Sequence, residues 1–229
     1  MGLYGVVLLI LYVNRHVLRT ETVVRSSAPG AEHELAFLKL PVVWWCFFYF
    51  FLSTMTLSVV QSFAPSILKA VHGVGLQAAS LTLTAYMLCS AFGVLLGGFV
   101  AAKMAAQSER VVAVAMAIGS VILLAVATGW AGPSGTMVLL AVTGLAIGVG
   151  GPSRDMMIKK ATPKGATGRV YGTVYSGLDV GFAVSPAVFG ILMDHGWFQL
   201  TLSGAALTLL CSVGAALMVG RLTHQAQMR

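Results

Sequence analysis

One carboxylate lies inside a long apolar stretch of this sequence. Asp179 falls near the middle of residues 168–192, which are mostly small and apolar. A charged group near the centre of a bilayer costs on the order of 3 kcal/mol even on lenient insertion scales, so such a residue is a functional candidate. Tyr171 and Tyr175 precede it at intervals of four and therefore share its helix face.

This face of Tyr171, Tyr175 and Asp179 predicts a coupling site for a proton or another cation, or a contact with a cationic substrate. The alternative is a structural role, in which a protonated or hydrogen-bonded Asp179 ties neighbouring helices together. The two roles need the same residue at the same depth, so the sequence leaves both open.

Two charged residues stand near the end of the preceding apolar stretch. Arg154 and Asp155 come before a basic loop that contains Lys159, Lys160 and Lys164. We expect Arg154 and Asp155 to form an inner gate network with other loop charges. The alternative is that these cations only anchor the loop on one side of a membrane, and it suits the lysines better.

Catalytic motifs are weak in this sequence. Gly132-Pro133-Ser134-Gly135 matches the Gly-x-Ser-Gly pattern of rhomboid-type intramembrane proteases, but a serine nucleophile needs a nearby base. No later span contains a histidine, since His195 falls in an outer loop. There is also no Gly-Lys dipeptide of a Walker phosphate loop and no His/Cys cluster with metal-ligand spacing. We therefore expect no enzyme activity, no catalytic residue, no cofactor and no metal.

The composition is that of a membrane protein. Of 229 residues, 58% are hydrophobic and only 9% are charged, whereas soluble domains carry about 25% charged residues. The net charge of +7 does not indicate nucleic acid, because all of the 14 Lys and Arg residues except Lys69 fall on one side of the membrane when spans are counted in alternation. That bias reports orientation. Cys46, Cys89 and Cys211 lie in apolar runs and read as small core residues.

Six stretches are long and apolar enough to cross a bilayer, which takes about 20 residues each. They are 41–63, 76–102, the stretch after Arg110 to about Trp130, 136–158, 168–192 and 198–220. We expect Pro65 in an outer turn, residues 132–135 in an outer loop, and a break in the fifth span at Gly150-Gly151-Pro152. Residues 1–18 predict a partial helix, 19–40 a cytoplasmic linker, 41–220 a six-helix domain and 221–229 a cytoplasmic tail.

Small residues at intervals of four predict close helix contacts. The stretch 76–102 contains such a stripe, and 168–192 is also rich in small residues. These are the middle helices of two consecutive triplets of opposite orientation, which suggests a 3+3 inverted repeat. The predicted fold is an all-α polytopic membrane protein. The stripe of the first triplet consists of Cys89, Gly93, Gly97 and Ala101.

Residues 150–194 resemble the region that joins the tenth and eleventh helices of the major facilitator superfamily. The resemblance extends over 41–220 as a carboxy-terminal six-helix half, with 1–18 similar to the end of the sixth helix and 19–40 to the loop between halves. Residues 98–103 resemble the family's Gly-Asp-Arg loop motif, with Ala102 where the family has aspartate. The motif residues of the main segment are Arg154, Asp155, Pro163, Gly168, Gly172, Gly181, Ser185, Pro186, Gly190 and Asp194.

This resemblance implies secondary, gradient-driven transport of a small solute by alternating access, with a cavity between two six-helix halves. It also implies that an amino-terminal half is absent from this chain. In the family the helix that corresponds to 41–63 lines the substrate path, which makes Thr54, Ser58 and Gln61 candidates, together with Tyr86 in the next span. Alternatively, the hydroxyl groups of Thr54 and Ser58 bond their own helix backbone four residues back.

The expected partners are a small-molecule substrate, a coupling proton, the lipid bilayer, and either an amino-terminal half or a second copy of the chain, but no nucleic acid. We expect an integral, multi-pass protein of the bacterial inner (plasma) membrane with a cytoplasmic carboxy terminus. Two alternatives remain. One is a six-span protein that does not transport, as a gene fragment or a membrane interaction module. The other, more remote, is a rhomboid-like serine protease.

Overall fold

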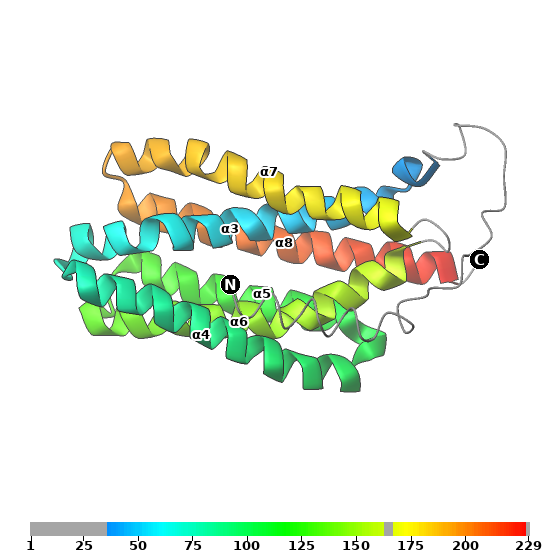
Figure 1. Cartoon of the computed structure of the whole chain (residues 1–229), viewed down its shortest axis with the longest axis horizontal. Helices are drawn as coiled ribbons and strands as arrows, with labels where there is room; N and C mark the ends of the chain where they lie inside the picture. Colours follow the sequence, from blue (N-terminus) through cyan, green and yellow to red (C-terminus); the bar gives the residue numbers. More distant parts are fainter. Residues whose placement is uncertain (1–35, 163–166, 228–229) are drawn as a thin grey trace, which may run out of the picture. The chain divides into compact units, whose positions relative to one another are not determined.

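Six long helices make up the computed structural model, which describes residues 36–162 and 167–227. Ala36–Arg229 forms one compact unit (Figure 1). All six helices are long and apolar enough to cross a membrane. The predicted partial helix at 1–18 lies outside the described residues. The helices are α3 (Pro41–His72), α4 (Leu76–Lys103), α5 (Ser108–Thr128), α6 (Gly132–Ala161), α7 (Thr167–Asp194) and α8 (Phe198–Gln227), with short 3-10 helices η1 (Ala36–Lys39) and η2 (Ala105–Gln107).

Three predictions about where helices end or break are wrong. Pro65 lies inside α3, which continues to His72 and ends where Gly73 adopts a positive φ of 63°. Residues 132–135 form the first turn of α6 and not a loop. Pro133 lies at the start of this helix, where proline is favoured. The same helix continues without a break past Pro152. Membrane helices tolerate internal proline because neighbouring helices and local adjustments satisfy the freed backbone groups.

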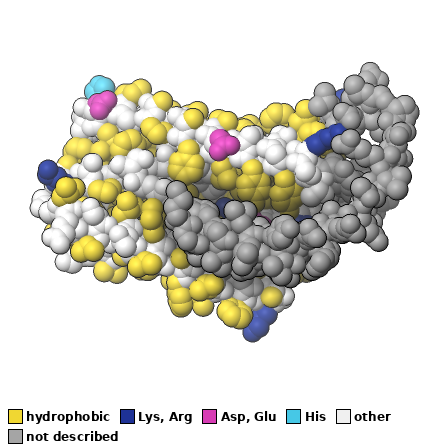
Figure 2. Space-filling view, in the orientation of Figure 1, with side chains coloured by type: hydrophobic (Ala, Val, Ile, Leu, Met, Phe, Trp, Pro, Cys, Tyr) yellow, Lys and Arg dark blue, Asp and Glu magenta, His cyan; other side chains and the backbone are white. Residues whose placement is uncertain are grey.

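The helix ends fall into two groups by charge. Basic residues lie at the start of α5 and α7 and at the end of α4, α6 and α8, and we call this the inner end. Lys69 lies at the opposite, outer end of α3. Figure 2 shows hydrophobic side chains spread along the length of one face, with most of the charged groups toward its two ends. The cations at the inner end are Lys39, Lys103, Arg110, Lys159, Lys160, Arg169 and Arg221.

The packing pairs confirm the predicted inverted repeat. The closest packing joins α4 to α6, α3 to α7, α5 to α8, α5 to α6 and α3 to α8. In such a repeat α3, α4 and α5 correspond to α6, α7 and α8. The α4–α6 contact then corresponds to the α7–α3 contact, and the α5–α6 contact corresponds to the α8–α3 contact. The α5–α8 pair maps onto itself. Four of these five pairs, all but α5–α6, join helices that are not consecutive in sequence, as in intertwined repeats of secondary transporters.

The α4–α6 contact is a backbone contact, and the predicted stripe on α4 forms one side of it. Glycine lets two helix backbones approach closely. A Cβ atom on Gly93 or Gly97 would overlap a carbonyl oxygen of α6, at Leu145 or Val149 respectively. Glycines of α6 do the same toward α4, because Gly144 and Gly148 leave no room for a Cβ beside the carbonyl oxygens of Tyr86 and Ser90.

The α3–α7 contact is also a close backbone contact, and its glycines come from α7 alone. Cβ atoms on Gly177 and Gly181 would lie 2.7 Å and 2.8 Å from the carbonyl oxygens of Phe47 and Phe51. One turn further, Ser185 Oγ donates a hydrogen bond of 3.0 Å to the carbonyl oxygen of Met55. Three small residues of α7 thus meet three successive turns of α3, which sets the register of α7 and the direction of its tyrosines.

Candidate functional site

Charged and aromatic side chains from three helices meet near the inner end, and we call this group the Asp155 cluster: Phe50, Arg154, Asp155, Tyr171 and Tyr175. Arg154 Nε donates to Asp155 Oδ1 over 3.3 Å. The hydroxyl of Tyr175 donates to the same oxygen, also over 3.3 Å. Arg154 and Asp155 are predicted gate residues and the tyrosines are predicted to lie on a substrate path, and the structure joins the two groups.

The aromatic rings of the cluster are arranged around the arginine. The guanidinium carbon of Arg154 lies 4.8 Å from the centroid of the Phe50 ring, within the range of a cation–π contact. The Phe50 and Tyr175 rings are 5.1 Å apart, and Tyr171 stacks on Tyr175 at 5.8 Å. Phe50 is fully buried, whereas the Asp155 side chain is 52% exposed. The cluster therefore joins α3, α6 and α7 at a place that solvent can reach.

Asp179 lies one turn beyond Tyr175 on α7 and is exposed. It is twelve positions after Thr167 and fifteen before Asp194, or about 18 Å along the helix from its inner end at 1.5 Å per residue. Within the part of the chain that the structure describes, Asp179 has no hydrogen bond and no ion pair. The carboxylate is therefore free to meet a solute, a proton or a partner helix.

The polar candidates on α3 and α4 lie in more buried places. Thr54 is buried against α7, where a Cβ on Gly181 would lie 3.0 Å from the Thr54 Cβ. Gln61 is partly exposed. Ser58 Oγ and Tyr86 Oη are buried and have no hydrogen-bond partner. In the described chain neither Thr54 nor Ser58 bonds the carbonyl four residues back, so that alternative does not account for them.

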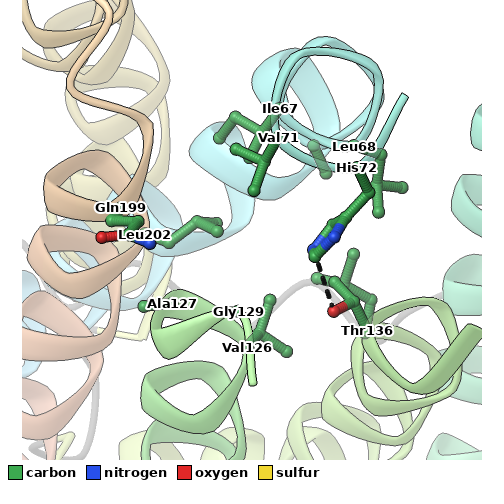
Figure 3. Close-up of a pocket in the computed structure, with 12 residues that line it drawn as sticks. Ile67, Leu68, Val71, His72, Val126, Ala127, Gly129, Thr136, Gln199 and Leu202 are labelled. Carbon is green, nitrogen blue, oxygen red and sulfur yellow. Dashed lines mark hydrogen bonds between the residues drawn. The ribbon is translucent and has the colours of Figure 1, made fainter. Parts of the chain in front are cut away.

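A small pocket lies at the outer end, between α3, α5, α6 and α8 (Figure 3). His72 of α3 bonds Thr136 of α6 over 3.2 Å at its edge. The pocket has a volume of about 10 Å³, which is room for one water molecule at most. It therefore does not bind a solute in this conformation. Ser134, the residue of the protease-like motif, is exposed on the first turn of α6. His72 of α3 bonds Thr136, which follows Ser134 by two residues.

Lys160 makes contacts that its position in the sequence does not predict. Its Nζ donates to the carbonyl oxygen of Ala106 over 3.0 Å and to Ser108 Oγ over 2.9 Å, and it lies 3.8 Å from a carboxylate oxygen of Glu109. The lysine therefore ties the inner end of α6 to the connection between α4 and α5. That connection follows Ala102, where the resemblance lacks the aspartate of the family motif. Glu109 was the available signal, because acidic residues are rare in this sequence.

The comparison with known families shows the family to which the chain belongs. The family model of the Major Facilitator Superfamily matches residues 46–227, which include most of the six-helix unit. The chain belongs to the major facilitator superfamily. The resemblance seen in residues 150–194 is thereby confirmed, and the six helices are a half-sized domain of a transporter of the major facilitator type. The family consists of transporters, which fits the expectation that the chain is not an enzyme. Neither a curated protein nor a solved structure gives a significant match.

Membership in this family also places the protein in its environment. A major facilitator protein is an integral, multi-pass membrane protein, and the six described helices have the length and hydropathy for that. A transporter of this type binds a small-molecule substrate within the bilayer. In the described residues, no group of three or more His, Cys, Asp or Glu side chains comes together as a metal site.

Proposed function

We propose that this unit is one half of a gradient-driven transporter that moves a small solute by alternating access. A second six-helix domain, in the same natural chain or in another, or a second copy of this chain, completes the cavity. The observation that carries the proposal is Asp179, a carboxylate half-way along α7 that is exposed on the six-helix unit and has no partner within its described residues. An unpaired carboxylate at that depth costs free energy, so its presence there points to a function.

Other polar groups of the six-helix unit support a path for a solute or proton. The Asp155 cluster lies one turn toward the inner end, since Tyr175 bonds Asp155 and is four residues from Asp179. On α3 and α4, the buried hydroxyl groups of Ser58 and Tyr86 lack hydrogen-bond partners. A buried unsatisfied polar group costs about 1–3 kcal/mol, so water or a solute at these hydroxyl groups would stabilise the protein.

In this proposal the Asp155 cluster acts as the inner gate. Arg154 belongs to α6, Phe50 to α3 and Tyr175 to α7, and the cluster connects all three near the inner end. Each contact is modest, because Arg154 and Asp155 are partly exposed and exposed ion pairs contribute about 0–1 kcal/mol. Contacts of that strength can open and re-form during a transport cycle. The inner end would then face the cytoplasm, following the positive-inside bias.

The test is proton-driven transport by the complete transporter in lipid vesicles, with a solute found by screening for accumulation under an imposed proton gradient. Asp179→Asn keeps the size and hydrogen-bonding ability of the side chain but cannot take up a proton. If Asp179 couples protons, this variant loses accumulation and retains solute exchange between the two sides. Full accumulation by the Asn variant refutes the coupling role. Asp179→Leu serves as the control for a structural role, which predicts lower stability for Leu only.

A further inference from the structure

A hollow opens at the inner ends of α5 and α8, on a part of the molecule that the transport proposal does not use. It has a volume of about 450 Å³ and is lined by Glu109, Arg110, Leu217, Gly220, Arg221 and His224. That volume falls within the usual range of small-ligand sites. At Gly220, α8 approaches α5 so closely that a Cβ would overlap the Glu109 side chain. The two helices therefore hold the charged residues of both close to one another.

The charge in this hollow is positive. Arg110 and Arg221 are exposed, and within the described residues neither has an ion pair. Glu109 is the acid in the lining, and Lys160 lies 3.8 Å from its carboxylate, which balances its charge. His224 adds a further nitrogen donor. Two guanidinium groups from different helices line this one hollow, and arginine binds phosphate through paired hydrogen bonds.

Each arginine ends an exposed apolar stripe. On α5, Val114 and Val121 are exposed four and eleven residues after Arg110, on the same helix face. On α8, Leu210 and Leu217 are exposed eleven and four residues before Arg221. Surfaces of this kind contact acyl chains in a membrane protein. The arginine at the end of each stripe lines the hollow, and so does Leu217 of the α8 stripe.

The depth of the arginines matches the level of lipid headgroups. Arg110 lies 18 residues before the end of α5 at Thr128, or about 27 Å along the helix. Arg221 lies 23 residues after the start of α8 at Phe198, or about 35 Å. The hydrocarbon core is about 30 Å thick, so both guanidinium groups lie near its inner boundary.

We propose that the hollow between α5 and α8 binds an anionic phospholipid of the inner leaflet. Arg110 and Arg221 hold the headgroup phosphate, and the acyl chains lie along the stripes that include Val114 and Leu217. The cytoplasmic leaflet carries anionic lipids, and the positive-inside bias places these ends there. The site does not depend on transport, so it stands or falls separately from the proposed function.

The test measures binding of the first lipid to the full chain in detergent by native mass spectrometry, with dioleoyl phosphatidylglycerol and dioleoyl phosphatidylcholine as probes. Since each basic residue near an anionic surface adds about a fivefold preference, we expect the chain to bind the anionic lipid roughly tenfold more tightly or better. The Arg110→Gln/Arg221→Gln pair should abolish this preference. The Arg110→Lys/Arg221→Lys pair keeps both charges and should retain most of it.

The matched control is Lys103→Gln/Lys159→Gln, which removes two exposed cations from the inner ends of α4 and α6. The proposal expects this control to keep the preference. An equal loss in both Gln pairs would mean diffuse attraction to the whole inner end and would overturn the site. No preference in the unmodified chain would overturn it as well. Displacement of bound phosphatidylglycerol by 10-fold excess inorganic phosphate would assign the hollow to a free anion and refute the lipid.

Discussion

The α4–α6 contact makes a sharp prediction because two adjacent glycines of α4 lie in opposite surroundings. Gly97 is buried, and a Cβ there would overlap the carbonyl group of Val149. Gly98 is exposed, and a Cβ there would meet nothing within 4 Å. We therefore compare Gly97→Ala with Gly98→Ala, which make the same chemical change at neighbouring positions of one helix.

The expected magnitudes follow from this geometry. Replacing glycine by alanine in a helix stabilises it by about 0.8–1 kcal/mol, and this gain applies to both variants. Only Gly97→Ala also forces α4 and α6 apart, because the obstructing atoms belong to the backbone and cannot rotate away. Overpacking of this kind costs about 1–3 kcal/mol. Gly97→Ala should therefore have a free energy of unfolding about 1–3 kcal/mol below that of Gly98→Ala, since the helix-propensity gain cancels in the comparison.

The assay is reversible unfolding of the purified chain in mixed detergent micelles by increasing SDS, followed by circular dichroism at 222 nm. Both variants are measured beside the unmodified protein under one set of conditions. If the two variants unfold within about 0.5 kcal/mol of each other, or if Gly97→Ala is the more stable, the close approach of α4 and α6 is wrong.

Two further predictions concern the gate and the orientation. Tyr175→Phe removes the hydrogen bond to the carboxylate of α6 and should lower the free energy of unfolding by about 0.5–1.5 kcal/mol. Tyr171→Phe removes a hydroxyl that has no hydrogen bond in the described structure and should change it little, so equal effects in the same SDS assay contradict the cluster geometry. A reporter fused at His195 should report the outer side of the membrane, and one fused at Lys103 the cytoplasm. A cytoplasmic signal at His195 would overturn the predicted orientation.

The span prediction succeeded in number and failed at particular turns. Composition and run length identify a membrane helix because the bilayer imposes both, and all six predicted spans correspond to helices. The sequence predicts an outer turn at Pro65 and a break at Pro152, and proline does interrupt most helices in water. In this protein they lie inside α3 and α6, where packing against neighbouring helices offsets the lost hydrogen bond.

The candidate site was predicted as separate residues and not as a cluster. Tyr171, Tyr175 and Asp179 could be placed on one face from their spacing alone. Tyr175 of α7 bonds Asp155 of α6, which is 20 residues away in sequence. This bond depends on how the packing of the other helices places α7 beside α6. Phe50 was not a candidate, since an aromatic residue in an apolar span carries no sign that an arginine will lie over its ring.

The sequence by itself determined the membrane class, the six spans, the charge asymmetry of their ends and the depth of Asp179, because each depends only on local composition and position along a helix. Tertiary structure alone decided which helices pair. That choice rests on which glycine meets which carbonyl group: Gly97 meets Val149 of α6, and Gly177 meets Phe47 of α3. Such contacts join residues more than 50 positions apart, and small residues occur on several faces of every span. Only the complete packing selects one set of faces, and with it the residues that surround Arg154 and Lys160.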